Sequence, residues 1–94
     1  MSLKIQQTDT FEYTFKVLIA FIEVNWGEKV VNEFIEETEK VIRLIANFPY
    51  MYKSSIFDET VRVATINKLS SLFYEITESS LILLYIVDSR QEPL

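Results

Sequence analysis

The first half of the chain carries apolar residues at helical spacing, in two stretches. In the first stretch they recur every three or four positions, at Phe11, Phe15, Leu18, Ile19, Ile22 and Trp26. Asp9 and Glu12 have the spacing of a capping box inside a run of cap-forming residues, so the predicted helix begins at Asp9. Gly27, the only glycine, follows the last apolar turn and is predicted to end the helix as a left-handed C′ residue.

The second stretch predicts a helix from about Glu28 to Ala46. Its expected buried stripe consists of Val31, Phe34, Ile35, Thr38, Ile42 and Ile45. The helix is expected to stop at Asn47-Phe48-Pro49, because the residue before a proline is pushed out of the α region. The junction around Gly27 is short, so the two helices are predicted to form an antiparallel hairpin.

The last third of the chain changes to β-type segments. Three such segments lie about eight to ten residues apart, which predicts a meander of antiparallel strands. The segments are Val61–Lys68, Leu72–Ile76 and Leu81–Val87. The turns of the meander are expected near Lys68-Leu69 and at 77–80. Residues 50–59 show no clean period and are predicted to be a loop with two or three anchoring aromatic side chains.

The segment Leu81–Val87 determines the predicted strand order. It is apolar on both faces, and such a strand belongs inside a sheet rather than at its edge. Only residues 3–7 remain to pair with its outer side, so the predicted order is 1-4-3-2. An up-down-up-down trace would make all four strands antiparallel. The prediction is therefore an α+β fold in one domain, residues 1–94, with a helix hairpin on a four-stranded antiparallel sheet.

Two helices cannot cover both faces of that sheet. The face without helices is expected to present Leu81, Leu83 and Tyr85, or Ile82, Leu84 and Ile86, together with Phe73 or with Leu72 and Tyr74. An apolar sheet face on a small protein indicates a protein interface. We take Phe73, Tyr74 and Tyr85 as candidate contacts for a partner or a second copy; the alternative is that these aromatic residues belong to the core.

Composition excludes several kinds of chemistry. The chain has no Cys and no His, so it lacks thiolate nucleophiles and the commonest general acid–base and metal ligand. No catalytic, cofactor or metal motif is present, and the glutamates of the second helix fit a solvated face. A net charge of −5 argues against direct nucleic-acid binding. No apolar run suits a membrane span or signal peptide, so we expect a cytoplasmic protein that does not bind membranes.

Three basic residues of the β half are candidate contacts for a phosphate or carboxylate of a target. Arg62 and Lys68 are an even number of positions apart and would share a strand face if Lys68 still belongs to the strand. Arg90 follows the last strand. The alternative is that they are surface charges that protect an edge strand.

The β half also carries a pattern of known type. It consists of three motifs: Val61-Arg62-x-Ala64-x-Ile66-x-Lys68, then Ser71-Leu72-Phe73-Tyr74-x-Ile76, then Ile86-x-Asp88-x-Arg90-Gln91-x-Pro93. In this pattern the chain resembles the ParE branch of the ParE/RelE toxin superfamily. The resemblance implies a toxin of a type II toxin–antitoxin (plasmid stabilisation) module, neutralised by a cognate antitoxin. It also implies DNA gyrase as the target of a binding inhibitor, and we expect a homodimer when the antitoxin is absent.

Two other functions remain open on the same fold. RelE-like members cleave messenger RNA on the ribosome, which needs several basic groups and usually a Tyr or His to move protons. The acidic balance and the lack of His favour a non-catalytic toxin over this reading. The third possibility is an interaction protein that is not toxic.

Overall fold

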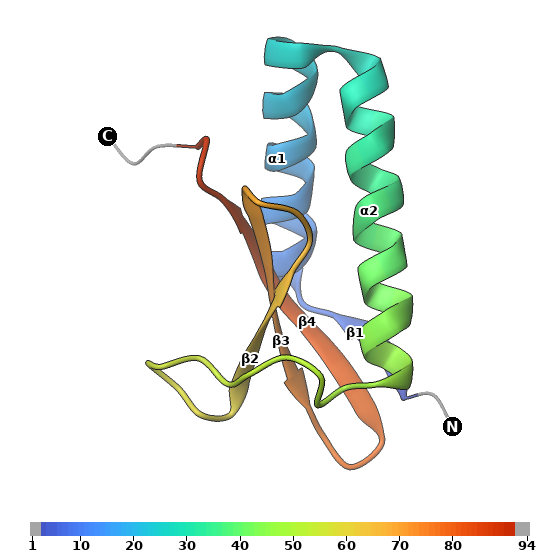
Figure 1. Cartoon of the computed structure of the whole chain (residues 1–94), viewed down its shortest axis with the longest axis vertical. Coiled ribbons are helices and arrows are strands. Elements are labelled where there is room, and N and C mark those ends of the chain that lie inside the picture. Colours follow the sequence, from blue (N-terminus) through green and yellow to red (C-terminus); the bar gives the residue numbers. More distant parts are fainter. Residues whose placement is uncertain (1–2, 92–94) are drawn as a thin grey trace.

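The computed structural model describes residues 3–91, which form a helix hairpin packed on a four-stranded sheet (Figure 1). The elements follow in the order β1 (Lys4–Gln7), α1 (Asp9–Trp26), α2 (Glu28–Asn47), β2 (Val61–Thr65), β3 (Ser70–Ile76) and β4 (Ser80–Asp88). Both predicted helices and all four predicted strands are confirmed, with boundaries within a few residues of those expected.

The ends of α1 are set by one side-chain cap and one glycine. Thr8, one residue before the predicted start, is the N-cap, and its Oγ1 accepts a hydrogen bond from the backbone N–H of Phe11 at 2.9 Å. Gly27 has φ 89° and ψ 174°, so its positive φ is as predicted but its ψ is extended rather than left-handed helical. This one residue joins α1 to α2, and any side chain there would be strained by the positive φ.

The strand order is β1-β4-β3-β2, as predicted, and β4 lies inside the sheet. The prediction that all four strands are antiparallel is wrong, because β1 runs parallel to β4, with Lys4 opposite Ser80 and Gln7 opposite Leu83. The error arises from the assumption that the chain reverses its direction between β1 and α1, at Thr8. A single extended residue joins β1 to α1, so the helix continues in the direction of the strand, and the chain first reverses at Gly27 (Figure 1).

One continuous hydrophobic core fills the space between the hairpin and the sheet. Its fully buried members include Leu18, Ile22, Ile45, Leu72, Tyr74, Leu81 and Leu83. The buried stripe of α2 runs through Val31, Phe34, Thr38, Val41 and Ile45, whereas Ile35 and Ile42 are only half-buried. The helix is thus rotated slightly from the predicted orientation, which turns those two isoleucines to the edge of the core.

A β-bulge in β4 changes which residues face the helices. The pairing passes from Phe73 opposite Tyr85 to Tyr74 opposite Leu83, so Leu84 is an extra residue. Residues 81 and 83 therefore face the core before the bulge, and residues 86 and 88 face it afterwards. Neither regularly alternating set predicted for the helix-free face is correct, because the bulge divides the strand between the two alternations.

Within the described residues, neither helix is long and apolar enough to cross a membrane.

Candidate functional site

The sheet face opposite the helices presents a pair of stacked aromatic rings. Phe73 of β3 and Tyr85 of β4 are direct cross-strand partners, and their ring centroids lie 4.5 Å apart at an interplanar angle of 18°. Both side chains are partly exposed. Val63 of β2 pairs with Phe73, and the exposed Val87 of β4 lies two residues beyond Tyr85. The helix-free face thus carries an apolar strip across three strands, centred on this pair.

Tyr74 is not part of that strip. Its side chain is fully buried on the opposite face of β3, and its hydroxyl donates a 2.7 Å hydrogen bond to the carbonyl of Pro49. Burial raises the pKa of Tyr74, against the opposing effect of the nearby Arg62 charge. Adjacent residues on a regular strand point to opposite faces, so Phe73 and Tyr74 do not both line one interface. Tyr74 is a core residue, as the alternative interpretation held.

Arg62 is held by the loop that precedes its own strand. One of its terminal nitrogens, Nη1, donates a hydrogen bond to the carbonyl of Tyr52 at 2.5 Å, and its guanidinium lies 4.8 Å from the ring centroid of Tyr50. A guanidinium over an aromatic face is a favourable cation–π contact. Arg62 therefore stabilises the segment 48–60 against β2, and its side chain is partly buried there.

Lys68 does not share a strand face with Arg62. β2 ends at Thr65, and Lys68 lies exposed in the turn before β3. The conditional prediction of a shared face fails because the strand is three residues too short. The turn is instead close to the end of β4, where the backbone N–H of Ser89 donates to the carbonyl of Leu69 at 2.8 Å. Lys68 and Arg90 are thus near the same end of the sheet, and Arg62 lies near the other.

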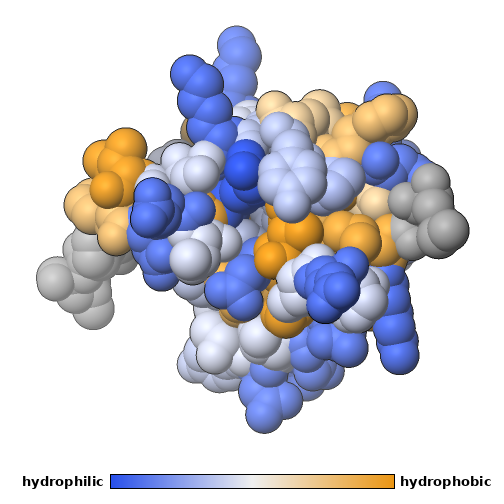
Figure 2. All heavy atoms as spheres, turned by 90° about the horizontal axis from the view of Figure 1, so that it is seen from below, coloured by the Kyte–Doolittle hydropathy of each residue, from blue (hydrophilic) through white to orange (hydrophobic). Residues whose placement is uncertain are grey.

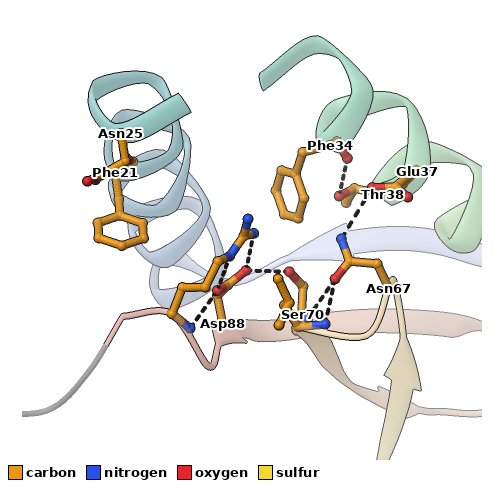
Figure 3. A network of polar contacts seen from close by, with 10 residues as sticks. Phe21, Asn25, Phe34, Glu37, Thr38, Asn67, Ser70 and Asp88 are labelled. Carbon is orange, nitrogen blue, oxygen red and sulfur yellow. Dashed lines mark hydrogen bonds and ion pairs between the residues drawn. The ribbon is translucent and has the colours of Figure 1, made fainter. Parts of the chain in front are cut away.

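Arg90 belongs to a polar cluster at the end of β4 (Figure 3). Its Nε and Nη2 donate to the two carboxylate oxygens of Asp88 at 2.8 and 2.7 Å, and its backbone N–H donates to the same carboxylate at 2.9 Å. The hydroxyl of Ser70 adds a 2.5 Å hydrogen bond. The side chain of Asp88 has no exposed surface, whereas that of Arg90 is 21% exposed. The guanidinium also lies over the Trp26 ring, 4.8 Å from its centroid.

The cluster keeps Asp88 ionised although it is buried. Burial by itself disfavours the charged carboxylate, but the hydrogen bonds from Arg90 and Ser70 outweigh that effect and hold the pKa of Asp88 below its ordinary value. The same bond to Asp88 raises the pKa of Arg90. A guanidinium has five N–H donors, and the pair uses only Nε–H and one N–H of Nη2, which leaves three donors not bound to Asp88.

The turn beside the cluster is tied to the helix layer. Asn67 donates from Nδ2 to a carboxylate oxygen of Glu37 on α2 at 3.2 Å, and its Oδ1 accepts from the backbone N–H groups of Leu69 and Ser70 (Figure 3). The sequence pattern pointed to Arg90 as a candidate, but not to its partners Asp88, Ser70 and Trp26. The spacing Asp88-x-Arg90 after an apolar strand was the one available signal, whereas Ser70 and Trp26 are remote in sequence.

A second apolar surface lies on the helix side. A groove of about 370 Å³ is lined by Gln7, Phe11, Phe15, Ile35, Thr38, Glu39, Ile42 and Arg43. Its floor is apolar, and Glu39 and Arg43 place one charge of each sign at its border. Among residues 3–91 no group of three or more acidic side chains is arranged to hold a metal ion.

Comparison with known proteins finds similarity in structure rather than in sequence. No protein-family model matches the chain, and no curated protein matches its sequence. A chain of the chromosomal ParDE TA system from P. aeruginosa superimposes with a TM-score of 0.78 at 10% identity, over 93% of this chain and 96% of that one. The chain has a ParE/RelE-like fold.

Two further structures agree with that assignment. A chain of the E. coli DinJ-YafQ toxin-antitoxin complex matches with a TM-score of 0.67 at 10% identity, over 96% of both chains. The conserved hypothetical protein HP0894 from Helicobacter pylori matches with a TM-score of 0.61 at 23% identity, over 94% of this chain and 96% of that one. These chains share the arrangement of helices and strands with this protein at 10–23% sequence identity.

Proposed function

We propose that this protein is the toxin component of a type II toxin–antitoxin module and that a cognate antitoxin neutralises it. The observation that carries the proposal is the partly exposed Phe73–Tyr85 stack on a sheet face opposite the helix layer. The proposal is supported by the ParE/RelE-like fold, since similar structures come from the ParDE TA system and the DinJ-YafQ toxin-antitoxin complex.

The antitoxin is proposed to cover the helix-free face, with Phe73 and Tyr85 at the centre of the contact. Stacked aromatic residues bury a large area at a small cost in side-chain entropy, which is why such residues dominate the energetics of many interfaces. The groove between α1 and α2 offers the same antitoxin a second apolar surface. In the absence of antitoxin, a second copy of the chain is proposed to cover the same strip.

The toxin is proposed to act by binding its target rather than by catalysis. No His or Cys is present to transfer protons, and the hydroxyl of Tyr74 is bound to Pro49 within the core. Arg90 retains N–H donors near the same end of the sheet as the exposed Lys68, so this end is the proposed contact with an anionic group of the target. DNA gyrase is the proposed target, from the resemblance of the β half to ParE.

The test begins with growth of a bacterial host that expresses the chain alone or with the product of the adjacent gene. We expect growth arrest by the chain alone and rescue by the antitoxin. Phe73→Ser combined with Tyr85→Ser should remain toxic but lose rescue. Val24→Ser, which replaces an exposed apolar residue on α1, is the matched control and should be rescued normally.

Assays with purified protein then separate the mechanisms. Inhibition of supercoiling by DNA gyrase supports the proposed target, whereas cleavage of messenger RNA on ribosomes would replace it by RelE-like activity. If the wild-type chain is harmless and inactive in both assays, the toxin proposal is wrong and the non-toxic interaction protein takes its place.

A further inference from the structure

The loop that precedes β2 carries the most exposed large apolar side chains among residues 3–91. Ile56 and Phe57 are 92% and 91% exposed and adjacent in sequence. The loop projects to the left in Figure 1, where it is the leftmost part of the described residues, and hydrophobic atoms protrude on the same side of Figure 2. A single exposed apolar residue is ordinary, but two neighbouring ones at the tip of a projecting loop form a compact apolar knob.

The knob is held in a defined conformation by hydrogen bonds across the base of the loop. The backbone N–H of Ser55 donates to the carbonyl of Val61 at 2.6 Å, and that of Val61 donates to the carbonyl of Asp58 at 3.1 Å. The hydroxyl oxygen of Ser55 accepts from the backbone N–H of Phe57 at 3.1 Å. Such a loop loses little conformational entropy on binding, because its backbone is already ordered before a partner arrives.

Within the loop itself the charges are of one sign, and the flanking basic residues Lys53 and Arg62 lie at its base, next to and in β2. Residues 55–61 include Asp58 and Glu59, both exposed, and no basic residue. Asp58 is fixed in place, because its Oδ1 accepts hydrogen bonds from both the backbone N–H and the hydroxyl of Thr60, at 2.9 and 2.7 Å. The knob is therefore an apolar anchor with a negatively charged border.

We propose that the 55–61 loop is a docking knob for a partner protein other than the antitoxin, one that offers an apolar pocket bordered by Lys or Arg side chains. Ile56 and Phe57 fill the pocket, and Asp58 and Glu59 meet its basic border. The charges disfavour the other occupants. Two knobs of this chain would bring four carboxylates together in a protein of net charge −5, and the negative surface of a membrane repels the same groups.

The test places a benzophenone side chain at position 57 of the full chain, in the native host with the antitoxin present. The control carries the same group at position 24, where Val24 is 85% exposed on α1. We expect a discrete covalent adduct with one protein from position 57 and none from position 24. The captured protein, once purified, should bind the wild-type chain with an affinity that falls as salt concentration rises.

Substitutions then test the chemistry of the contact. Ile56→Ser with Phe57→Ser, and separately Asp58→Lys with Glu59→Lys, should each weaken binding at least about tenfold, whereas Val24→Ser should leave it unchanged. Circular dichroism should show wild-type folding for every variant, because the altered side chains are exposed. The proposal is overturned if position 57 gives no specific adduct or an adduct only with the antitoxin, a second copy or lipid. Binding that survives both double substitutions overturns it as well.

Discussion

Arg62 and Arg90 lie near opposite ends of the sheet and illustrate two ways in which a protein engages a basic side chain. Arg62 contacts only neutral groups, a backbone carbonyl and the ring of Tyr50. Arg90 holds a buried carboxylate through two side-chain bonds, with Trp26 on its other side. Loss of Arg62 frees a loop, but loss of Arg90 leaves an ionised group buried without its counter-charge. The same residue type therefore has unequal structural importance at the two ends.

The largest expected effect is that of Arg90→Ala. Breaking a buried ion pair by removing one partner is strongly destabilising, and with Arg90 partly exposed we expect a loss of about 3 kcal/mol in the free energy of unfolding. Urea denaturation measures it, and Asp88→Asn combined with Arg90→Ala should recover part of the loss. An exposed residue beyond the last strand would ordinarily contribute little to stability, but the pairing of Arg90 with the buried Asp88 reverses that expectation. A wild-type unfolding midpoint for Arg90→Ala would remove the distinction between the two arginines.

The pH dependence of stability isolates the carboxylate side of that pair. The folded-state pKa of Asp88 lies below its ordinary value of 3.8, so its stabilising contribution is complete above that value and is lost as pH falls through the lower folded pKa. Wild-type protein should therefore lose stability more steeply than Asp88→Asn in acid below about pH 4. Parallel curves for the two proteins, measured by thermal unfolding, would show that Asp88 is not stabilised in its ionised form.

Arg62→Ala should have a smaller effect, of about 1–2 kcal/mol, from one charge-assisted hydrogen bond and one cation–π contact at a partly exposed site. The loss should be local, so amide hydrogen exchange should increase in residues 48–60 and remain unchanged around Asp88. Arg62→Lys retains the charge but not the planar contact with Tyr50, and it should recover only part of the stability. Exchange that rises equally at both ends would contradict the division between the two sites.

Lys68→Ala should have the smallest effect on stability, within about 0.5 kcal/mol, because the side chain is exposed in a turn. The Lys68→Ala substitution is therefore useful as a test of function rather than of stability. If this end of the sheet contacts the target, Lys68→Ala should weaken growth arrest without a change in stability, which Arg90→Ala cannot test cleanly. Lys4→Ala, at an exposed position of β1, is the control. Unaltered toxicity of Lys68→Ala would exclude Lys68 from the proposed target site.

Much of the fold was predictable from local patterns. The boundaries of α1 and α2 followed from the helical spacing of apolar residues, from Gly27 and from Pro49, because these signals act within a few residues of chain. The internal position of β4 followed from a segment that is apolar on both faces. Two of the three candidate interface residues, Phe73 and Tyr85, lie on the helix-free face. The third, Tyr74, lies in the core, although strand alternation alone argued against placing it beside Phe73.

By itself, then, the sequence determined which elements form, the strand order and the presence of an apolar sheet face to be covered. Only the tertiary structure decided the direction of β1, the bulge at Leu84 and the partners of the three basic residues. The physical reason is the distance along the sequence over which each kind of signal acts. Helix periodicity and strand hydrophobicity are properties of neighbouring residues, whereas the pairing of Ser70 with Asp88 and of Trp26 with Arg90 requires segments remote in sequence to meet at one end of the sheet. Nothing in the local pattern encodes that meeting, so the chemistry of the Asp88–Arg90 cluster could be known only once the chain was folded.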